Sequence, residues 1–401
     1  MTETPDLYVL AGGRVADATG TRDADVVLSP DEGRIVAVGD DAETEAARED
    51  ADDVETVDVS GSVVAPGLVD SHVHLMMDSR PDVATVDTES REMLSYRAAA
   101  NLRANVEAGV TTVRDLGAPG TLALDAGTAV ETGVLEGPRV LACGQNVVMT
   151  GGHGHWFGRE ADGPHEVRKA VREQLKRGAD VVKCMATGGV LTEGAQTGAP
   201  ELTPEELAAV VDAASAENVP TSAHAHGQRG IQNAVRAGIT SVEHATFMDR
   251  ETAELLAEEG TYWVPTASAL EGIVENGVEG GIPEEAVEKA EDAQERFERA
   301  WEHALDAGVT VAMGTDAGTP FNVHGENARR EIELMCDYGM SPEAALEAAT
   351  VTGAELLGLD DTGLVEPGYR ADVVVLDADP TEDASAWRES EAVFAAGRRI
   401  V

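Results

Sequence analysis

The chain of 401 residues carries 75 acidic and 29 basic side chains, which gives a formal net charge of −46 at pH 7. A surface of this charge repels nucleic acid phosphates and anionic lipid head groups, so neither is expected as a partner. Only four of the basic residues are lysines, and such an acidic, lysine-poor composition suggests adaptation to high salt.

The cysteines and the N-terminus indicate a reducing compartment. Cys143, Cys184 and Cys336 are too few and too scattered for a disulfide framework or a thiolate zinc site. The first residues lack the basic and apolar regions of a signal peptide, and no apolar run is long enough to span a bilayer. We therefore expect a cytoplasmic protein. A monomer and a homo-oligomer are both compatible with the sequence.

The two ends of the chain predict one small β domain. Short apolar segments separated by Gly, Asp and Ser turns occupy residues 7–10, 25–28, 34–38 and 54–59, and the same style returns at 372–377 and 392–401. An acidic stretch at residues 42–49 is the one helical candidate among them. We expect residues 1–64 and 359–401 to form this domain together.

Between them, apolar strands alternate with amphipathic helices. We expect eight strands, at residues 68–74, 111–115, 140–143, 181–185, 221–224, 241–244, 262–265 and 311–314. Glycines at 109, 238 and 308 are placed to cap helices, and Thr203-Pro204 and Ser341-Pro342 are placed to begin them. Eight strand–helix units in residues 65–358 predict a (β/α)8 barrel. A doubly wound sheet is disfavoured because the first strand is followed by histidines rather than a dinucleotide-binding glycine motif.

His72 and His74 lie two residues apart in the first predicted barrel strand. Successive strand side chains alternate between faces, so the two imidazoles point the same way. Two neutral imidazoles on a buried face require hydrogen-bond partners or a metal ion. Taken alone, the pair fits a metal site or two satisfied histidines at a strand end.

Lys183 stands inside the apolar fourth strand of a chain that uses lysine sparingly. Burial lowers the pKa of an ammonium, and the neutral amine can then react with carbon dioxide to give a carbamate. The carbamate acts as a carboxylate that can bridge two metal ions. The alternative is a lysine whose head group reaches a nearby acid.

Three further polar residues fall at the carboxyl ends of predicted strands, where barrel enzymes carry their chemistry. His224 ends the fifth strand, His244 the sixth, and Asp316 follows the eighth. Each has an ordinary structural explanation on its own, such as helix capping for Asp316. Their coincidence at one end of the barrel with His72, His74 and Lys183 favours a shared site.

This pattern resembles the binuclear centre of the amidohydrolase superfamily. The resemblance covers nearly the whole chain, including a β-sandwich made from both termini. The motifs Gly151-Gly152-His153-Gly154, Ala186-Thr187-Gly188-Gly189 after Lys183, and Thr315-Asp316-Ala317-Gly318 resemble the imidazolonepropionase-related, prolidase-like group.

The resemblance implies a ligand set and a reaction. His72, His74 and Asp316 would hold the more buried ion, His224 and His244 the more exposed one, and carbamylated Lys183 would bridge them. Zinc is the first choice, although manganese, cobalt or iron would also accept these ligands. A bridging hydroxide would attack an amide-like carbonyl, and Asp316 would carry its proton to the departing amine. Lys183 and His244 complete the implied catalytic set.

The expected substrate is a small molecule, a dipeptide or an N-acyl amino acid. His153, in a glycine-rich loop, and His226, two residues beyond His224, are candidates to hold its carboxylate or carbonyl. His226 could instead support a metal ligand from behind. Arg114 and Asp115, at the end of the second strand, are expected to form a structural ion pair.

Other functions stay open at this point. A mononuclear deaminase on the same barrel would lack the bridging lysine and carry a glutamate soon after the strand-five histidine. Here Ala225, His226, Gly227 and Gln228 follow His224. An imidazolonepropionase-like cyclic amide hydrolase is a further alternative. A non-catalytic scaffold would be expected to have lost ligands, and none is lost.

Overall fold

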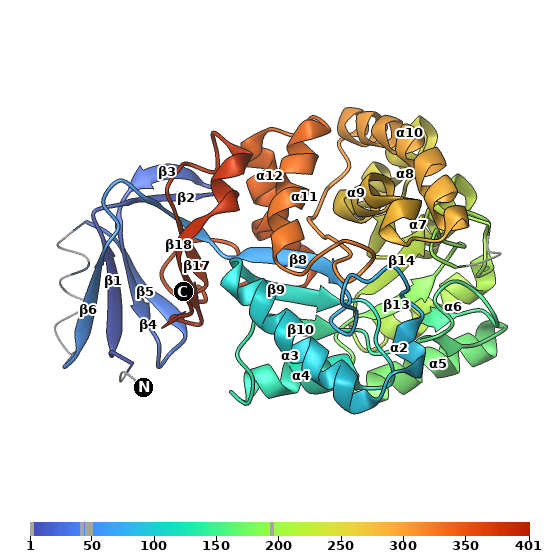
Figure 1. The fold of residues 1–401 in the computed structure, drawn as a ribbon, viewed down its shortest axis with the longest axis horizontal. Helices are drawn as coiled ribbons and strands as arrows, with labels where there is room; N and C mark the ends of the chain where they lie inside the picture. Colours follow the sequence, from blue (N-terminus) through green and yellow to red (C-terminus); the bar gives the residue numbers. More distant parts are fainter. Residues whose placement is uncertain (1–3, 41–43, 45–50, 193–195) are drawn as a thin grey trace.

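The computed structural model describes residues 4–40, 44, 51–192 and 196–401, and it has a small β domain beside a larger α/β barrel (Figure 1). Apart from Thr44, the acidic stretch 42–49 lies outside the described residues. The chain termini both lie in the β domain, as the sequence predicts.

Two sheets form the β domain. One has the strand order β5-β4-β1-β6 and the other β19-β18-β17-β7-β2-β3. Their bounds are β1 (Leu7–Ala11), β2 (Arg14–Asp17), β3 (Gly20–Asp23), β4 (Asp25–Ser29), β5 (Arg34–Gly39), β6 (Val54–Asp58), β7 (Val63–Pro66), β17 (Val373–Leu376), β18 (Ser390–Ala395) and β19 (Arg398–Arg399).

The two sheets pack face to face through alternate residues of their strands. Tyr8 and Leu10 of β1 point into the same apolar cluster as Val373 and Phe394 of the other sheet. The rings of Tyr8 and Phe394 meet edge-on with centroids 5.2 Å apart. The expected β-sandwich is confirmed, and β17 pairs directly with β7, which joins the two ends of the chain. The exact domain limits at residues 64 and 359 stay a prediction.

The barrel strands are parallel and follow one another in chain order. They are β8 (Leu68–Val73), β9 (Val110–Asp115), β10 (Arg139–Ala142), β11 (Val147–Val148), β13 (Val182–Met185), β14 (Thr221–Ala225), β15 (Ser241–His244) and β16 (Tyr262–Val264). Seven of the eight predicted strands are therefore present. The third continues beyond its predicted end as β11, which pairs with β13 and with the short β12 (Arg159–Glu160).

The eighth predicted strand, 311–314, is not a regular strand. It contacts its neighbours through isolated bridges, Trp263 with Val311 and Val73 with Ala317, and through a backbone bond from the Ser71 N–H to the Met313 carbonyl at 2.9 Å. The physical reason is that Thr315 donates its backbone N–H to the Asp70 carboxylate at 3.0 Å, in place of a carbonyl of a neighbouring strand. The neighbouring Gly314 lets the backbone lie close to Val264 of β16, because a Cβ atom at residue 314 would lie only 2.5 Å from Val264 Cγ1.

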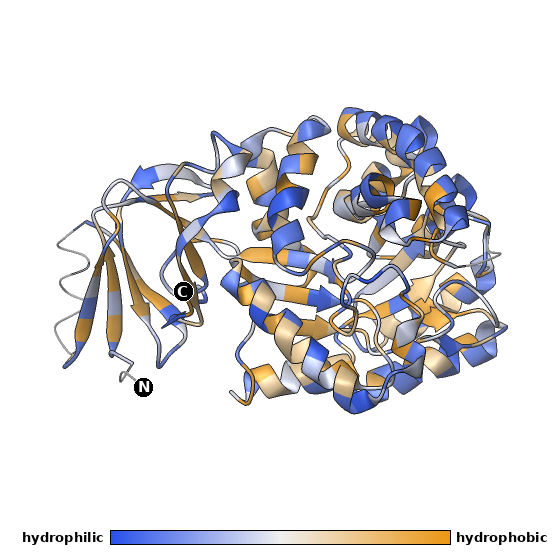
Figure 2. Ribbon diagram, viewed as in Figure 1, coloured by the Kyte–Doolittle hydropathy of each residue, from blue (hydrophilic) through white to orange (hydrophobic). Residues whose placement is uncertain are grey.

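Helices surround the barrel, with the bounds α2 (Thr85–Thr88), α3 (Arg91–Glu107), α4 (Leu122–Glu131), α5 (Pro164–Lys176), α6 (Pro204–Ser215), α7 (Gln228–Ala237), α8 (Arg250–Glu259), α9 (Ala267–Asn276), α10 (Glu284–Ala307), α11 (Glu326–Asp337), α12 (Pro342–Ala349) and α13 (Val351–Leu356). The short 3-10 helices are η1 (Val278–Gly280) and η2 (Ala384–Arg388). Figure 2 shows hydrophobic residues along the strands and polar residues on the outer faces of the helices.

The predicted helix ends are confirmed. Gly238 and Gly308 end their helices with φ of 88° and 73°, a region that costs glycine little. Thr203 and Ser341 accept the backbone N–H groups of Glu206 and Ala344. Within the part of the chain that the structure describes, no helix has the length and apolar character needed to cross a membrane.

The net charge of −46 predicts that salt stabilises this fold. Raising KCl from 0.1 to 1 M shortens the screening length from about 10 Å to about 3 Å, which weakens repulsion between surface carboxylates. We expect the thermal unfolding midpoint, followed by circular dichroism, to rise by several degrees. Sucrose at matched osmolality, which does not screen charge, serves as the control. An unchanged or falling midpoint in KCl would contradict the expectation.

Candidate metal centre

One cavity gathers all the site residues that the sequence predicts. Together with apolar residues, it is lined by His72, His74, His153, Lys183, His224, His226, His244 and Asp316. The cavity contains about 850 Å³ of space free of protein atoms, part of it open to solvent. It lies at the carboxyl ends of the barrel strands, as expected for this fold.

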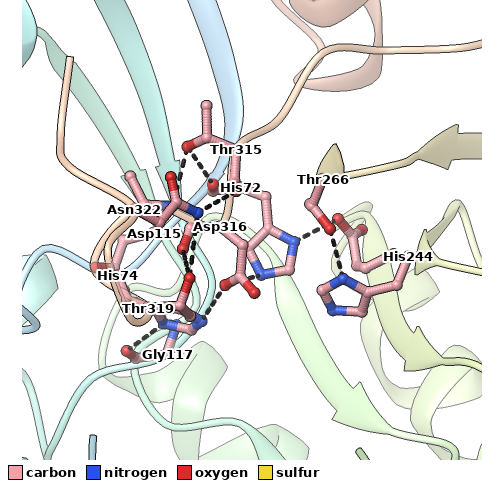
Figure 3. A network of polar contacts seen from close by, with 12 residues as sticks. His72, His74, Asp115, Gly117, His244, Thr266, Thr315, Asp316, Thr319 and Asn322 are labelled. Atoms are coloured by element: carbon pink, nitrogen blue, oxygen red, sulfur yellow. Dashed lines mark hydrogen bonds and ion pairs between the residues drawn. The ribbon is translucent and has the colours of Figure 1, made fainter. Parts of the chain in front are cut away.

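The tightest group in the cavity is His72, His74 and Asp316 (Figure 3). One potential ligand atom from each lies within 4.8 Å of the other two. Asp316 Oδ1 is 3.3 Å from His72 Nε2 and 3.1 Å from His74 Nε2, yet it is buried without a hydrogen-bond partner. Two ring nitrogens and a carboxylate oxygen facing one point are a ligand set for a divalent ion.

The partners of the two imidazoles on β8 determine which nitrogen faces the cavity. His72 Nδ1 contacts Glu243 Oε2 at 3.0 Å, and His74 Nδ1 contacts the carbonyl oxygen of Gly117 at 3.1 Å. A carboxylate and a carbonyl only accept, so each Nδ1 carries the proton and donates. In the neutral ring, Nε2 then keeps its lone pair, and this is the form of histidine that binds a metal.

Three of the other four histidines that line the cavity contact threonines. Nδ1 of His153, His226 and His244 contacts Oγ1 of Thr192 at 2.7 Å, Thr246 at 2.7 Å and Thr266 at 2.6 Å, respectively. A hydroxyl both donates and accepts, so these contacts allow either tautomer. These imidazoles can therefore present a lone pair or an N–H to the cavity.

His224 lies at the centre of this second group. Its ring centroid is 4.3 Å from that of His153 and 4.7 Å from those of His226 and His244. Its Nε2 is buried and has no hydrogen-bond partner. Burial and the neighbouring imidazoles hold the pKa of His224 well below its ordinary value. A neutral imidazole with an unpartnered nitrogen is a suitable ligand for a cation.

An unusual backbone conformation directs the side chains of two site residues, His244 and Asp316, into the cavity. Along β15, Ser241 and Glu243 share the barrel interior, so regular alternation would turn His244 away from it. His244 instead has φ of 68° and Ala245 has φ of 48°. Asp316 also lies in the left-handed region, with φ of 61°. Such conformations are uncommon outside glycine and are concentrated at functional sites.

Lys183 is fully buried on β13, and its Nζ has no hydrogen-bond partner in the structure. Burial lowers the pKa of this amine, although Glu243 partly opposes the shift. The alternative that the sequence leaves open, a lysine reaching a nearby acid for an ion pair, does not match this geometry. A buried amine beside metal-type ligands needs a partner, and a covalent modification of the amine or a bound ion would provide one.

A buried ion pair supports the site from below. Arg114 Nη2 donates to Glu243 Oε1 at 3.0 Å and Oε2 at 3.2 Å, while Arg114 Nε donates to the carbonyl oxygen of Ser71. Ser222 and Ser241 add hydroxyl bonds to Glu243 Oε1 at 2.7 and 2.6 Å. Burial alone would raise the pKa of Glu243, but Arg114, Lys183 and His72 hold it well below its ordinary range.

The predicted ion pair between Arg114 and Asp115 was wrong. Neighbouring residues on a strand point to opposite faces, so Arg114 reaches across the barrel to Glu243. Asp115 instead accepts the backbone N–H groups of Leu75 at 2.8 Å and Gly117 at 3.1 Å. It thereby orders the loop whose Gly117 carbonyl holds His74.

Charges inside the cavity keep Asp316 ionised. Burial raises the pKa of Asp316, but His72, His74 and Lys183 together lower it by more than burial raises it, so the net shift is downward. Burial lowers the pKa of His72 to about 4. At His74, burial also lowers the pKa, but Asp316, Asp115 and the Gly117 carbonyl together raise it by more, so the net shift is upward. His153 and His226 are uncharged at pH 7, because burial lowers their pKa values to about 3 and about 4.

Several residues of the site are absent from the sequence predictions. Glu243 and the three threonines carry no motif of their own, because their role depends on which strands meet across the barrel. Asp70 accepts the backbone N–H and hydroxyl of Thr315 at 3.0 and 2.7 Å, and so positions the residue before Asp316. His324 is also buried nearby, but its nitrogens contact Asn105 Nδ2 and the carbonyl oxygen of His74, which satisfies it structurally.

Comparison with known proteins gives consistent matches. Residues 63–400 match the amidohydrolase family. Ochratoxinase from Aspergillus niger is 32% identical over 82% of this chain and 73% of its own length. Imidazolonepropionase from Streptomyces griseus subsp. griseus is 27% identical over 95% of this chain and 93% of its own. A crystal structure of a Xaa-Pro dipeptidase with bound methionine in the active site is 32% identical, covers 98% and 99% of the two chains, and superposes with a TM-score of 0.88.

Replacing Arg114 with methionine tests the ion pair beneath the site. The substitution leaves the Glu243 carboxylate buried without its guanidinium, so we expect unfolding in urea at pH 7 to require about 3–5 kcal/mol less free energy. The control is Arg103→Met on α3, which removes an exposed pair with Glu107 and should cost at most about 1 kcal/mol. Equal losses of unfolding free energy in the two variants would show that the buried pair matters no more to stability than the exposed one.

Proposed function

The chain belongs to the amidohydrolase family and is a hydrolase acting on C–N bonds, and we propose that it cleaves the amide bond of a dipeptide or an N-acyl amino acid with two divalent metal ions. One observation carries the proposal. Six ligand-type side chains converge on one cavity: His72, His74, Lys183, His224, His244 and Asp316. Lys183, His224 and Asp316 each have a buried ligand atom without a hydrogen-bond partner, and Nε2 of His72 and of His74 face Asp316 Oδ1.

The donor set fits divalent ions. His72 Nε2, His74 Nε2 and Asp316 would hold the more buried ion, and His224 and His244 the more exposed one. Imidazole and carboxylate ligands without thiolate suit zinc, and they also accept manganese, cobalt or iron. Bound there, such ions supply Lewis acidity and lower the pKa of a coordinated water.

Lys183 would complete the set as a carbamate. The uncharged Nζ bonds to the carbon of carbon dioxide and releases one proton, which leaves an anionic group with two oxygens. This reaction needs a deprotonated amine, and burial favours that form. The position of Lys183 on β13, beside β14 with His224, supports a bridging role between the two groups of histidines.

Asp316 is the proposed proton carrier. Held ionised between His72 and His74, it can take the proton of the attacking water on its second carboxylate oxygen. Delivery of that proton to the amide nitrogen allows the amine to leave. General acid–base catalysis of this kind contributes about 10²- to 10⁴-fold in rate.

His153 and His226 are proposed to bind the substrate. Each is anchored by a threonine at Nδ1, and each is uncharged at pH 7. With the proton on Nε2, either ring can donate a hydrogen bond to a substrate carbonyl or carboxylate oxygen. The relatives named as a Xaa-Pro dipeptidase and an ochratoxinase support an amide substrate.

A screen of dipeptides and N-acyl amino acids tests this function. The enzyme, reconstituted with zinc or manganese in concentrated KCl, should release free amino acid from at least one class. Imidazolone propionate is included because of the similarity to imidazolonepropionase. Ammonia release from an amino-heterocycle with no amide hydrolysis would point to a deaminase. No turnover of any compound by metal-replete enzyme would favour a binding protein.

The role of Lys183 is tested with Lys183→Ala. We expect two metal ions per wild-type chain by elemental analysis, at most about one in the variant, and a loss of activity of at least about 10²-fold. Short carboxylic acids such as formate or propionate should restore part of this activity. Lys169→Ala, which removes an exposed lysine of α5, is the matched control. Full activity of the wild type with one bound ion would overturn the binuclear proposal.

A further inference from the structure

Hydrophobic side chains line the cavity beside the histidines. Around the site stands a group of hydrophobic side chains, which we call the apolar wall: Trp156, Phe157, Val190, Leu191, Leu270 and Ile273. None of these was singled out in the sequence, because they come from two loops and from α9. The wall and the histidines line one continuous cavity, so a molecule bound at the histidines also meets the wall.

One side of the apolar wall belongs to α9. Leu270 and Ile273 lie three residues apart, so they project from the same face of the helix. Ile273 is 4% exposed and packs in one cluster with Val190 of the loop after β13 and with Val287 of α10. The helix begins directly after Thr266, whose hydroxyl holds His244. This side is therefore fixed relative to a proposed metal ligand.

The other side of the apolar wall comes from the glycine-rich loop. The Phe157 ring lies edge-on to His74 with centroids 5.7 Å apart, and the Trp156 ring lies 6.1 Å from His153. Phe157 is 5% exposed. Two aromatic rings thus stand beside the imidazoles at which the scissile amide is proposed to bind.

Fixed charge is scarce in this cavity. Among the described residues that line it, Lys183 and Asp316 are the only members of the lysine, arginine, aspartate and glutamate types, and both belong to the proposed metal centre. A charged substrate side chain placed against the wall would lose its water without gaining a partner. An apolar side chain there would gain the free energy of burial.

We propose that the apolar wall selects substrates with a bulky hydrophobic or aromatic group next to the scissile amide. The inference rests on the proposed function and adds the substrate class to it. N-acyl derivatives of phenylalanine, leucine or methionine fit the wall. Derivatives of arginine, lysine or glutamate leave a charge unpaired, and derivatives of glycine leave the wall in contact with water.

A substrate series measures this selection. For zinc-loaded enzyme, we expect kcat/KM for N-acetyl-phenylalanine and N-acetyl-leucine to exceed that for N-acetyl-glycine, N-acetyl-arginine and N-acetyl-glutamate by at least about tenfold, the size of a hydrophobic-pocket preference. A flat series, or a preference for a charged member, would overturn the proposal while leaving amide hydrolysis intact.

Variants on α9 assign the preference to the wall. In Leu270→Ala and Ile273→Ala, the ratio of kcat/KM for the phenylalanine derivative to kcat/KM for the glycine derivative should fall at least about fivefold. Val274→Ala is the matched control, because it removes a similar volume from the same helix at a residue that does not line the cavity. An equal effect in Val274→Ala would attribute the change to a loosened helix.

Binding separates this inference from the proposed function. Calorimetry of zinc-loaded enzyme with 3-phenylpropanoate and with 5-aminopentanoate measures how tightly each acid binds, without any turnover. If 3-phenylpropanoate binds at least about tenfold more tightly, and Ile273→Ala removes the difference, the inference stands even where no amide is hydrolysed. Equal binding of the two acids, with or without hydrolysis, would overturn it.

Discussion

The site depends on the hydrogen bonds of one buried carboxylate, that of Glu243. It crosses the barrel interior to receive the guanidinium of Arg114 from β9, two serine hydroxyls from β14 and β15, and the imidazole of His72 from β8. A buried charge pair contributes little net stability because desolvation offsets its attraction. Its role here is to orient the side chains that bond to it. The carboxylate holds the Nδ1 proton of His72 and connects the paired strands β8 and β9 with the paired strands β14 and β15 across the barrel interior.

The kind of hydrogen-bond partner divides the histidines by role. Nδ1 of His72 and of His74 contacts an oxygen that only accepts hydrogen bonds, which leaves the Nε2 lone pair of the neutral ring available for a cation. His153 and His226 rest on threonine hydroxyls, which leave the ring free to donate to a substrate oxygen. His244 also rests on a threonine, Thr266 at the start of α9, and its left-handed backbone brings the ring into the cavity. In the proposed function, histidines would thus bind both metal and substrate within a single cavity.

Local periodicity made much of this molecule predictable. Alternation along β8 is enough to place His72 and His74 on one face, and glycine and threonine caps mark the joints between elements. The irregular eighth segment could not be foreseen, since it results from a side-chain bond between Asp70 and Thr315 that replaces strand pairing. Alternation also misassigns His244, whose face is reversed by positive φ angles. Partners such as Glu243, and the apolar wall, arise only when distant strands and loops meet.

The central claim, that these side chains form a binuclear metal centre, is tested most directly by anomalous X-ray diffraction at the zinc absorption edge from crystals grown with zinc. The account predicts two peaks about 3.5–4 Å apart. One should lie about 2.0–2.2 Å from His72 Nε2, His74 Nε2 and an oxygen of Asp316, and the other at similar distances from His224 and His244, with density extending from Lys183 Nζ between them. A single peak, or peaks confined to surface carboxylates, would contradict it.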